Sequence, residues 1–453
     1  NGYRIPTSNI VINMAPADIR KEGSAYDLPL AIGMLAAGEV IQSDKLNRYL
    51  MMGELSLDGS LQPIKGALPI AIKARELGFE GIIVPRQNAR EAAVVNKIQV
   101  YGVENIKEVI EFFNGNQELP PTIVNTREEF YAQQSDFDLD FSDVKGQENV
   151  KRALEVAAAG GHNIILIGAP GSGKSMLAKR LPSILPPLSL GESLETTKIH
   201  SVAGRLQANA GLISKRPFRD PHHTISTVAM TGGGSYPQPG EISLAHNGIL
   251  FLDELPEFAR ETVEALRQPL EEGAVHLVRL GGSYVYPADF MLVAAMNPCP
   301  CGYYPDMQKC RCTQTAIHRY LERISQPILD RIDICVEAPA LTFGELTGQQ
   351  KEETSAAIQK RVAVAQDIQR ERYRKEGFSY NSQIPATKIR EYCALDKKQE
   401  QYMEEIYGKL QLTARSYHKL LRVARTLADM DGCDRHLEEA ICYRSFDRKF
   451  WER

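Results

Sequence analysis

The hydrophobic pattern opens with a stretch in which strand-like and helix-like segments alternate. NIVINMAP (residues 9–16) and EGIIVP (80–85) predict buried strands, whereas DLPLAIGMLAAGEV (27–40) and NAREAAVVNK (88–97) have the apolar spacing of helices. Strands that alternate with helices indicate a parallel sheet. We therefore expect residues 1–118 to form one α/β domain, followed by a polar linker over 119–142.

A second alternating stretch follows. GQENVKRALEVAAAGG (146–161) predicts a helix that stops at paired glycines, and GILFLDE (248–254) and FMLVAAMN (290–297) predict buried strands. Residues 143–345 are expected to form a second α/β domain on a parallel sheet. The remaining residues, 346–453, are predicted to form a helical domain. Within it, EETSAAIQKRVAVAQDIQRERYRK (352–375) predicts a long exposed helix.

A glycine-rich stretch between a predicted strand and a predicted helix, ILIGAPGSGKSMLAKRL (165–181), matches G-x-x-x-x-G-K-[ST]. In such a loop backbone N–H groups surround the β-phosphate, Lys174 reaches the β- and γ-phosphates, and Ser175 holds Mg²⁺. The following helix adds its positive N-terminus. The alternative is a mere glycine-rich turn, which the flanking strand and helix disfavour. The expected ATP-binding residues are Gly168, Ala169, Pro170, Gly171, Ser172, Gly173, Lys174 and Ser175.

Polar residues at the ends of later segments complete the predicted site. Asp253 is expected to support Mg²⁺ and Glu254 to activate the attacking water, which favours hydrolysis over transfer to a substrate. Asn297 is placed to hydrogen-bond that water or the γ-phosphate, and Arg331 to complete the site of a neighbouring subunit. The alternatives are a buried strand that ends in two acids, an Asn-Pro turn and a surface salt bridge, respectively.

The composition limits which kinds of binding partner we expect. The 453 residues are 43% hydrophobic and 24% charged, with a net charge of −4, so a DNA-binding role needs local basic patches. No apolar run approaches the roughly 18 residues of a membrane span, and no signal peptide opens the chain. We expect a cytoplasmic protein without a membrane partner. Since the chain starts at Asn1 as if within a domain, we also expect that an N-terminal piece is missing.

The motifs in this order resemble the AAA+ ATPases, and within them the magnesium-chelatase and MCM-helicase branch. ILDRID (328–333) matches the segment that carries the arginine finger of that branch, at Arg331. TARSYHKLLRVARTLADMDG (413–432) resembles its sensor-2 helix, in which Arg415 matches the arginine that reaches ATP. The resemblance implies a P-loop core followed by a C-terminal helical lid.

A narrower resemblance covers essentially the whole chain. PFRDPHHTIS (217–226), GEISLAHNGILFLDELPEF (240–258) and MNPCPCGYYPD (296–306) are similar to the ComM/YifB family of magnesium-chelatase-like proteins. This resemblance implies a homo-hexameric ATPase that moves on single-stranded or branched DNA, in a family linked to branch migration during natural transformation. The alternatives are a chelatase motor subunit that remodels a protein partner, and a nucleotide-gated scaffold without turnover.

The N-terminal domain resembles the Lon-protease domain, which has a ribosomal-S5-domain-2-like fold, through KEGSAYDLPLAIGMLAAGEV (21–40) and the segment 53–85. A Lon protease needs a serine nucleophile and an activating lysine. The serine position falls on Ala25, beside Ser24, and the lysine position falls on Leu68, three residues after Lys65. We therefore expect a non-catalytic module. Because chelatase motors lack such a domain, its presence favours the ComM alternative.

Two segments are candidates for DNA contact. The segment 214–240 carries Lys215, Arg216 and Arg219, and AVHLVRLGGSYVYPADF (274–290) predicts a β-hairpin with Arg279 near its tip. Basic side chains contact phosphates without reading sequence. The segments resemble, respectively, a pore-facing insert and the pre-sensor-1 hairpin of MCM-like helicases, and the alternative for both is an ordinary surface loop.

Four of the eight cysteines lie close together in CPCGYYPDMQKCRC (299–312). Cys299, Cys301, Cys310 and Cys312 follow the spacing C-x-C-x₈-C-x-C and are able to close a tetrahedral Zn²⁺ site. The single-residue spacing departs from the usual two-residue knuckle, so reduced thiols without a metal remain the alternative.

Overall fold

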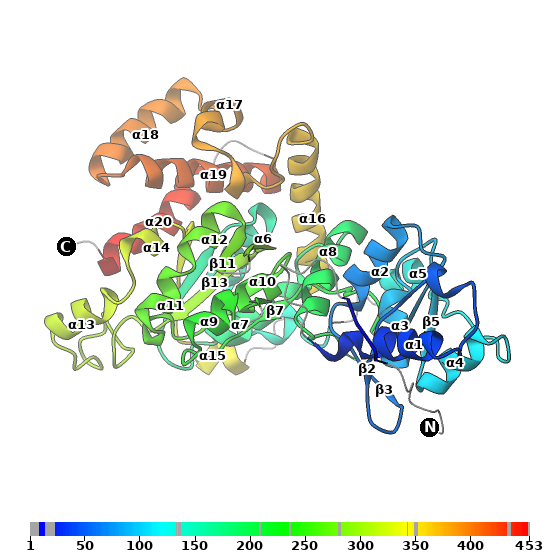
Figure 1. Ribbon diagram of the computed structural model, residues 1–453. Coiled ribbons are helices and arrows are strands. Elements are labelled where there is room, and N and C mark those ends of the chain that lie inside the picture. The colour runs from blue at the N-terminus through cyan, green and yellow to red at the C-terminus, as the bar shows by residue number, and fades with distance from the viewer. Residues whose placement is uncertain are drawn as a thin grey trace. The chain divides into compact units, whose positions relative to one another are not determined.

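The computed structural model describes residues 9–13, 23–132, 134, 137–207, 210–234, 237–279, 282–341, 343–347, 352–432 and 436–451. The chain divides into two compact units (Figure 1). Unit 1 comprises Asn1–Gln134, Leu188–Ser214 and Val278–Tyr284, and unit 2 comprises Ser135–Pro187, Lys215–Leu277 and Val285–Arg453.

Unit 1 is built on a parallel three-stranded sheet with the order β1–β4–β5. All five residues of β4 are buried, as its apolar run predicts, and alternate side chains face opposite layers. Ile83 joins a core with α1 and α4, whereas Ile82 and Val84 join a core with α2 and α3. The elements are α1 (Asp27–Ala37), β1 (Tyr49–Met51), β2 (Glu54–Leu55), β3 (Leu61–Gln62), α2 (Ala67–Glu76), β4 (Gly81–Pro85), α3 (Arg86–Ala92), β5 (Gln99–Val103), α4 (Ile106–Phe113) and α5 (Thr126–Ala132).

Some predictions for this region differ from the structure. Residues 9–13 of the predicted first strand are not in a strand, and the rest of that segment lies outside the described residues. The predicted linker contains the short helix α5, and Phe130 of this helix is buried.

Helix α8 (Leu190–Val202) belongs to unit 1, although it lies in the sequence between segments of unit 2. The N–H of Gly66 donates to the carbonyl of Ser201 at 3.1 Å, and the Ser201 hydroxyl donates to the Glu91 carboxylate. Leu194 packs on the core formed by α2 and α3. One helix from within the predicted second domain therefore completes the N-terminal unit.

Unit 2 contains a parallel five-stranded sheet with the order β14–β6–β13–β10–β7, which is 5-1-4-3-2 when its strands are counted along the chain. The expected α/β fold with a parallel sheet is thus confirmed. The chain leaves the neighbouring strands β6 and β13 toward opposite sides of the sheet, so the strand order reverses between them. Ligands of such sheets bind at this point of reversal, outside the carboxyl ends of the strands. The strands are β6 (Ile164–Gly168), β7 (Phe218–Arg219), β10 (Ile249–Leu252), β13 (Met291–Met296) and β14 (Ile334–Ala338).

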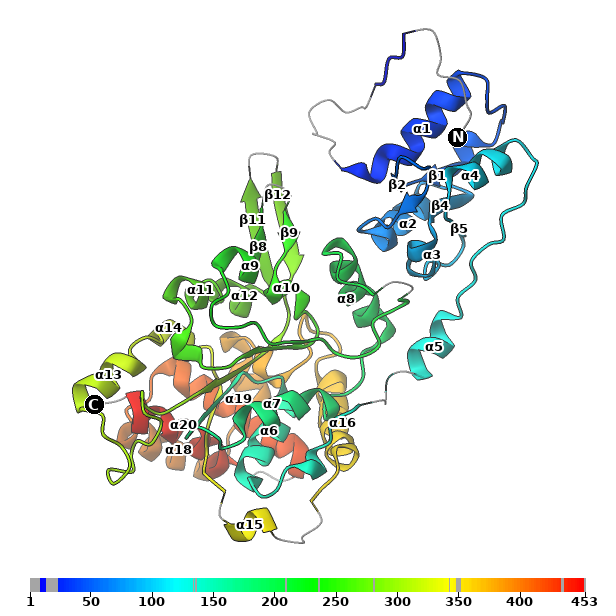
Figure 2. The same cartoon turned by 90° about the horizontal axis from the view of Figure 1, so that it is seen from below.

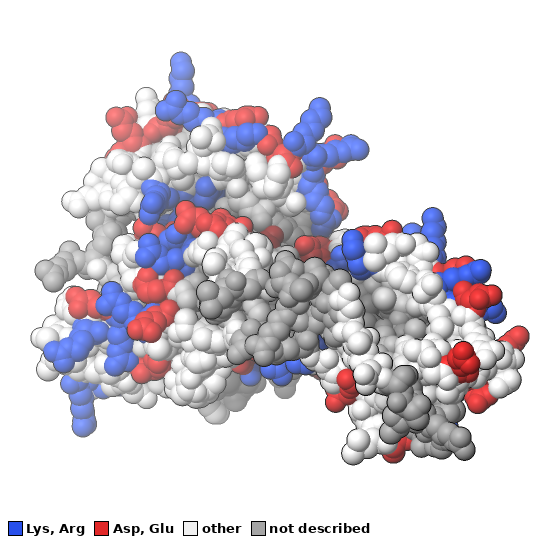
Figure 3. Space-filling view, viewed as in Figure 1, with Lys and Arg blue, Asp and Glu red and all other residues white. Residues whose placement is uncertain are grey.

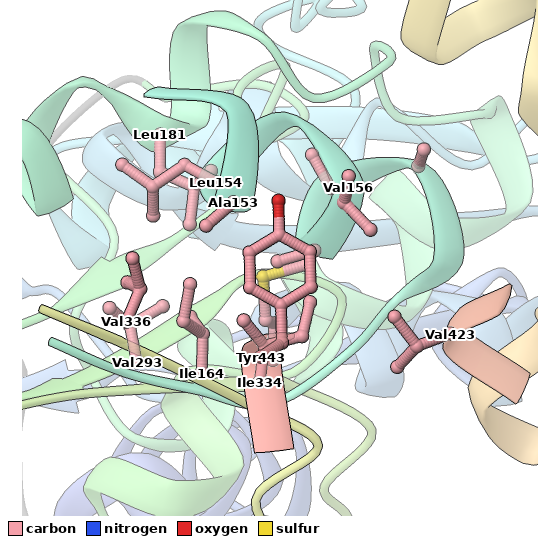
Figure 4. Close-up of a cluster of buried hydrophobic side chains, with 14 of the residues drawn as sticks. Ala153, Leu154, Val156, Ile164, Leu181, Val293, Ile334, Val336, Val423 and Tyr443 are labelled. Carbon is pink, nitrogen blue, oxygen red and sulfur yellow. The ribbon is translucent and has the colours of Figure 1, made fainter. Parts of the chain in front are cut away.

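Both faces of this sheet are buried, which explains why its strands read as continuous apolar runs. Ile164, Val293 and Ile334 point into a core with Leu154 of α6 and with α16, α19 and α20 (Figure 4). The intervening residues, among them Ile165, pack on the other face against α10, α11, α13 and α14. The helices are α6 (Glu148–Gly160), α7 (Lys174–Arg180), α9 (Thr227–Thr231), α10 (Glu241–Leu244), α11 (Arg260–Glu264), α12 (Arg267–Glu272), α13 (Gln314–Leu321) and α14 (Gln326–Leu329).

The C-terminal part of unit 2 is helical, as expected, but α16 is not an exposed helix. Val362 and Ala365 are fully buried, and the side chain of Gln369 donates to the carbonyl of Ala159 at 2.9 Å. The charged residues occupy only the outer face of α16. The helices are α15 (Phe343–Thr347), α16 (Ser355–Arg372), α17 (Ile389–Tyr392), α18 (Lys397–Lys409), α19 (Ala414–Asp431) and α20 (Leu437–Trp451).

The remaining strands form two small antiparallel pairs in the part of the chain that follows β7. They are β8 (Gly232–Gly233) with β9 (Gln238–Pro239), and β11 (Ala274–Arg279) with β12 (Gly282–Pro287). The β11–β12 pair is the hairpin that the sequence predicts (Figure 2). Among the described ranges, none of the helices combines the length and the apolar character needed to cross a bilayer.

Candidate nucleotide site and the opposite sheet edge

The glycine-rich loop connects the carboxyl end of β6 to α7. Gly171 and Gly173 have φ values of 76° and 84°, which residues with a side chain rarely adopt, and so permit the tight turn. Lys174 is only 8% exposed, and its Nζ donates to the carbonyls of Gly168 at 2.8 Å and Ala169 at 2.9 Å. Burial lowers the pKa of Lys174, while the charges of Asp253 and Glu254 act in the opposite direction. The ammonium group is thus held across the loop.

The residues predicted to hold Mg²⁺ meet at the ends of neighbouring segments. The Ser175 hydroxyl, in the first turn of α7, donates to Oδ2 of Asp253, which follows β10, at 2.5 Å. Hydroxyl and carboxylate oxygens are the hard ligands that Mg²⁺ prefers, and the ion usually keeps several waters besides. The donor set therefore fits Mg²⁺. Asn297, after β13, lies at the same edge, with its Oδ1 3.4 Å from Lys174 Nζ.

Glu254 is held in an unusual backbone conformation. Its φ of 54° and ψ of 46° are left-handed, and its N–H donates to Oδ1 of Asp253 at 2.9 Å. Such strain in a residue with a side chain costs about 1 kcal/mol or more and is concentrated at functional sites. Nδ1 of His223 lies 3.5 Å from Oε2 of Glu254. Sequence reasoning gave His223 no role, because only the pairing of β7 with β10 brings the two residues together.

Arg331 and Arg415 lie at the opposite edge of the sheet from the P-loop. Both line a cavity of about 790 Å³ whose wall includes Asn163, Phe290 and Asp333. These three residues immediately precede β6, β13 and β14, so the cavity lies at the amino ends of the strands. Neither arginine is therefore placed to reach the P-loop of its own chain.

The two arginines differ in how firmly they are held. Nη2 of Arg331 lies 2.5 Å from Oε2 of Glu271, and Nη1 donates to the carbonyl of Pro327 at 2.7 Å. Arg415 is exposed, with Nη1 3.5 Å from Oδ2 of Asp330. Arg331 is thus positioned by its own chain, whereas the exposed Arg415 is held by a longer contact.

A buried acid anchors the floor of this cavity, and the sequence analysis did not identify it. Oδ2 of Asp333 lies 3.3 Å from Nδ1 of His162, and its Oδ1 lies 3.8 Å from Nζ of Lys419. Burial by itself raises the pKa of Asp333, but the hydrogen bond with His162 and the charge of Lys419 bring it down to about 2. Asp333 therefore stays ionised and links β14 to α6 and α19.

The residues predicted to contact DNA from segment 214–240 are engaged within unit 2. Arg219 donates to both carboxylate oxygens of Glu241, at 2.6 and 2.8 Å, and Arg216 donates to the carbonyls of Pro186 and Asn247 at 2.7 and 2.8 Å. Nζ of Lys215 lies 5.6 Å from the centre of the Phe137 ring. Arg216 and Arg219 therefore already have partners within their own chain, which a phosphate would have to displace.

The hairpin is the other predicted DNA contact. Arg279 ends β11, next to the hairpin tip, and its side chain lies outside the described residues. On the visible surface of unit 2, Lys and Arg are interspersed with Asp and Glu (Figure 3). The described residues on that face therefore form no broad basic field.

The four clustered cysteines come together as their spacing predicts. The sulfur atoms of Cys299, Cys301, Cys310 and Cys312 lie within 4.8 Å of one another.

Comparison with known proteins gives matches along the whole chain. Three family models match: subunit ChlI of Mg-chelatase at residues 1–88, magnesium chelatase subunit ChlI at 140–346, and the C-terminal part of magnesium chelatase subunit ChlI at 352–444. The magnesium-chelatase 67 kDa subunit of Chlorobaculum parvum is 30% identical over 162 residues, which are 35% of this chain and 23% of that protein. Fold, site and these matches define the class: a magnesium-chelatase-like AAA+ ATPase.

Two relatives match over nearly the full length. The uncharacterized protein YifB of Salmonella typhimurium is 44% identical over 99% of this chain and 87% of that protein, and the competence protein ComM of Haemophilus influenzae is 41% identical over 98% and 87%. The chain belongs to the ComM/YifB family. The model that matches residues 1–88 is itself described as a chelatase subunit, so the N-terminal domain does not separate the two alternatives as expected.

Proposed function

We propose that copies of this chain form a cytoplasmic ring, a homo-hexamer, that hydrolyses ATP between neighbouring subunits and thereby moves DNA. In each site Lys174 binds the phosphates, Ser175 and Asp253 hold Mg²⁺, and Glu254 takes the proton of the attacking water. Mg²⁺ supplies charge neutralisation at the phosphates. Asn297 orients the water, and the next subunit supplies Arg331 and Arg415.

The observation that carries this proposal is the position of the two arginines. The P-loop occupies the carboxyl edge of the sheet, and Arg331 and Arg415 line a cavity at its amino edge. A head-to-tail contact between copies brings one edge to the other, and such contacts form a ring when the rotation between neighbouring copies closes. The carboxylate of Glu271, which pairs with Arg331, then gives way to the γ-phosphate.

DNA is proposed as the substrate because of the hairpin and the relatives. We propose that six copies of the β11–β12 hairpin, with Arg279 near the tip, contact DNA phosphates and convert hydrolysis into movement. The competence protein ComM is a relative over nearly the full length of the chain, which supports a role in competence. Branch migration of recombination intermediates during natural transformation is the DNA reaction that we propose for this role. The N-terminal domain serves as a non-catalytic, Lon-like module.

A chelatase-type motor that remodels a protein partner is the second candidate. The descriptions of all three matching family models favour it. It uses the same ATP site and differs only in what the ring acts upon. A nucleotide-gated scaffold is a third candidate, against which the placement of Glu254 beside the P-loop weighs.

One experiment separates these candidates: the steady-state ATPase rate without DNA, with linear duplex and with a four-way junction. We expect the junction to raise the rate severalfold and to be converted into duplex products. A rate that no DNA changes, but that a protein partner raises, supports the chelatase candidate. Tight ATP binding without any turnover supports the scaffold.

A further inference from the structure

The loop that follows Asn297 brings four thiols together beside the nucleotide site. Sulfur–sulfur distances are 3.3 Å for Cys299 and Cys301, 3.8 Å for Cys299 and Cys310, and 3.5 Å for Cys301 and Cys310. Zn–S bonds of about 2.3 Å in a tetrahedron place the sulfurs roughly 3.8 Å apart. A disulfide needs about 2.05 Å. The spacing therefore fits one metal ion held by four thiolates, with Cys312 as the fourth ligand.

The backbone around the cluster supports the same conclusion. Residues 297–313, all of them described, contain no helix or strand, yet Cys299 and Cys310 are buried. The N–H of Tyr304 donates to Sγ of Cys299 at 3.4 Å, and the N–H of Gly302 donates to the carbonyl of Cys299 at 2.9 Å. Hydrogen bonds of this kind orient ligands in metal sites. Thiols that merely fill a core pack against any apolar neighbour and do not need to converge.

The same loop packs directly on the P-loop. Gly302 lies between the second and third cysteines with a φ of 85°, and a Cβ on it would lie 2.3 Å from Cδ and 2.7 Å from Cγ of Pro170. Only glycine permits this approach of the backbone to the proline ring. Cys299 is also two residues from Asn297, which contacts Lys174. The cluster is therefore fixed to two parts of the nucleotide site.

We propose that Cys299, Cys301, Cys310 and Cys312 bind one Zn²⁺, and that the loop closed by this metal holds Pro170 and Asn297 in place for ATP. Without the metal, the irregular loop loses its cross-link, and the P-loop loses the surface against which Pro170 packs. Zinc occupancy then sets the affinity for ATP. The second half of the proposal rests on the nucleotide site proposed above, whereas the zinc site does not.

The metal site is tested by elemental analysis of the full chain purified under reducing conditions. We expect one zinc per chain, and after exchange with Co²⁺ the absorption bands of a tetrahedral thiolate complex. Cys301→Ser should lose the metal, whereas Cys301→His should keep it, because imidazole also ligates zinc. Cys442→Ser, an exposed cysteine outside the cluster, is the matched control. A wild-type chain that neither contains nor takes up Zn²⁺ overturns the site.

The link to ATP is tested by nucleotide titration of the same proteins. Gly302→Ala should keep its zinc but bind ATP roughly tenfold more weakly or worse, because a displaced P-loop loses at least one hydrogen bond to the charged phosphates. Cys301→Ser should be weakened likewise, and Cys301→His should recover. Unchanged ATP affinity in both Gly302→Ala and Cys301→Ser overturns the link. A wild-type chain that binds zinc but no ATP refutes the nucleotide site and leaves the zinc site standing.

Discussion

At the scale of single residues, Glu254 has the geometry expected of a strained functional group. Its backbone is left-handed, and 57% of its side chain is exposed. Nδ1 of His223 lies beside its carboxylate. The acid is therefore accessible to a water at the edge where Lys174 and Asn297 meet.

Replacing the proposed base tests this role. Glu254→Gln should bind ATP normally but hydrolyse it about a hundredfold more slowly or worse, because an amide cannot accept the proton of the attacking water. Phosphate release and nucleotide titration measure the two effects. Glu257→Gln is the matched control: Glu257 lies three residues on and pairs with Arg323 at 2.9 Å. Wild-type turnover in Glu254→Gln removes the role.

At the scale of elements, a buried polar network joins the helical C-terminal part to the sheet. His162 follows α6, with its Nε2 2.8 Å from Oγ1 of Thr426 in α19, and its Nδ1 faces Asp333 at the start of β14. Removing one partner of a buried ion pair leaves an uncompensated charge, which typically costs about 3–5 kcal/mol. Asp333 thus fixes where α19 lies on the sheet.

This network predicts an acid-dependent stability. The pKa of Asp333 is about 2, against an ordinary value of 3.8, so the carboxylate stabilises the folded state fully above pH 4 and loses that contribution between pH 4 and 2. The contribution is about 2 kcal/mol. Asp333→Asn should lower the free energy of unfolding at pH 7 and flatten its fall over this range. Denaturant titrations followed by the single tryptophan, Trp451 in α20, report on unit 2.

The control for this experiment is an acid in an exposed ion pair. Asp367→Asn removes a carboxylate on α16 whose partner Arg370 is also exposed, and such pairs contribute at most about 1 kcal/mol. Equal destabilisation by Asp333→Asn and Asp367→Asn would contradict the network.

A second prediction at the scale of elements concerns the β11–β12 hairpin. Arg279→Ala should lose most of the stimulation of ATPase by DNA while keeping its basal rate, since a phosphate contact acts only when DNA is bound. Arg370→Ala removes an exposed arginine from α16 and serves as the control. ATPase rates at several salt concentrations measure both, and equal loss of basal and stimulated rates would point to misfolding instead.

At the scale of the whole molecule, the two edges of the unit 2 sheet carry different halves of the proposed site. Lys174, Asp253 and Glu254 lie at the carboxyl edge, and Arg331 and Arg415 lie at the amino edge. A single chain is therefore incomplete as an ATPase if the arginines are needed. In the proposed assembly, hydrolysis depends on the contact between copies, and this dependence would let a ring coordinate its sites.

Mixing two inactive variants tests the shared site. Lys174→Ala should not bind ATP, and Arg331→Ala should bind but not hydrolyse it. In mixed rings an intact P-loop meets an intact arginine at some contacts, so activity should reappear. Arg415→Ala mixed with Lys174→Ala should recover likewise.

The control mixture combines two defects of the same edge. Glu254→Gln with Lys174→Ala should stay inactive, because no contact in such a ring regains both groups on one P-loop edge. Absence of recovery in the Arg331→Ala mixture, or a fully active monomer, would contradict a site shared between subunits.

The glycine-rich loop, the strands β4, β6, β10 and β13, and the hairpin follow from short stretches of sequence. A phosphate loop needs its glycines and lysine within a few neighbouring residues, and a strand buried on both faces is apolar throughout. Asp253, Glu254 and Asn297 were predicted in the same way, because they directly follow apolar strands. The carboxyl ends of parallel strands meet at one edge, so their grouping also follows.

The sequence by itself determined most of the local elements, though not the state of residues 9–13 or the helix in the linker. It also determined the parallel α/β class and the residues of one sheet edge, because these depend mainly on neighbours along the chain. Only the tertiary structure decided that α8 joins unit 1, that His223 lies beside Glu254, and that Gly302 packs on Pro170. It also decided that Arg331 and Arg415 share a cavity. Such contacts depend on strand order and on packing between distant segments, which no periodicity of a single segment encodes.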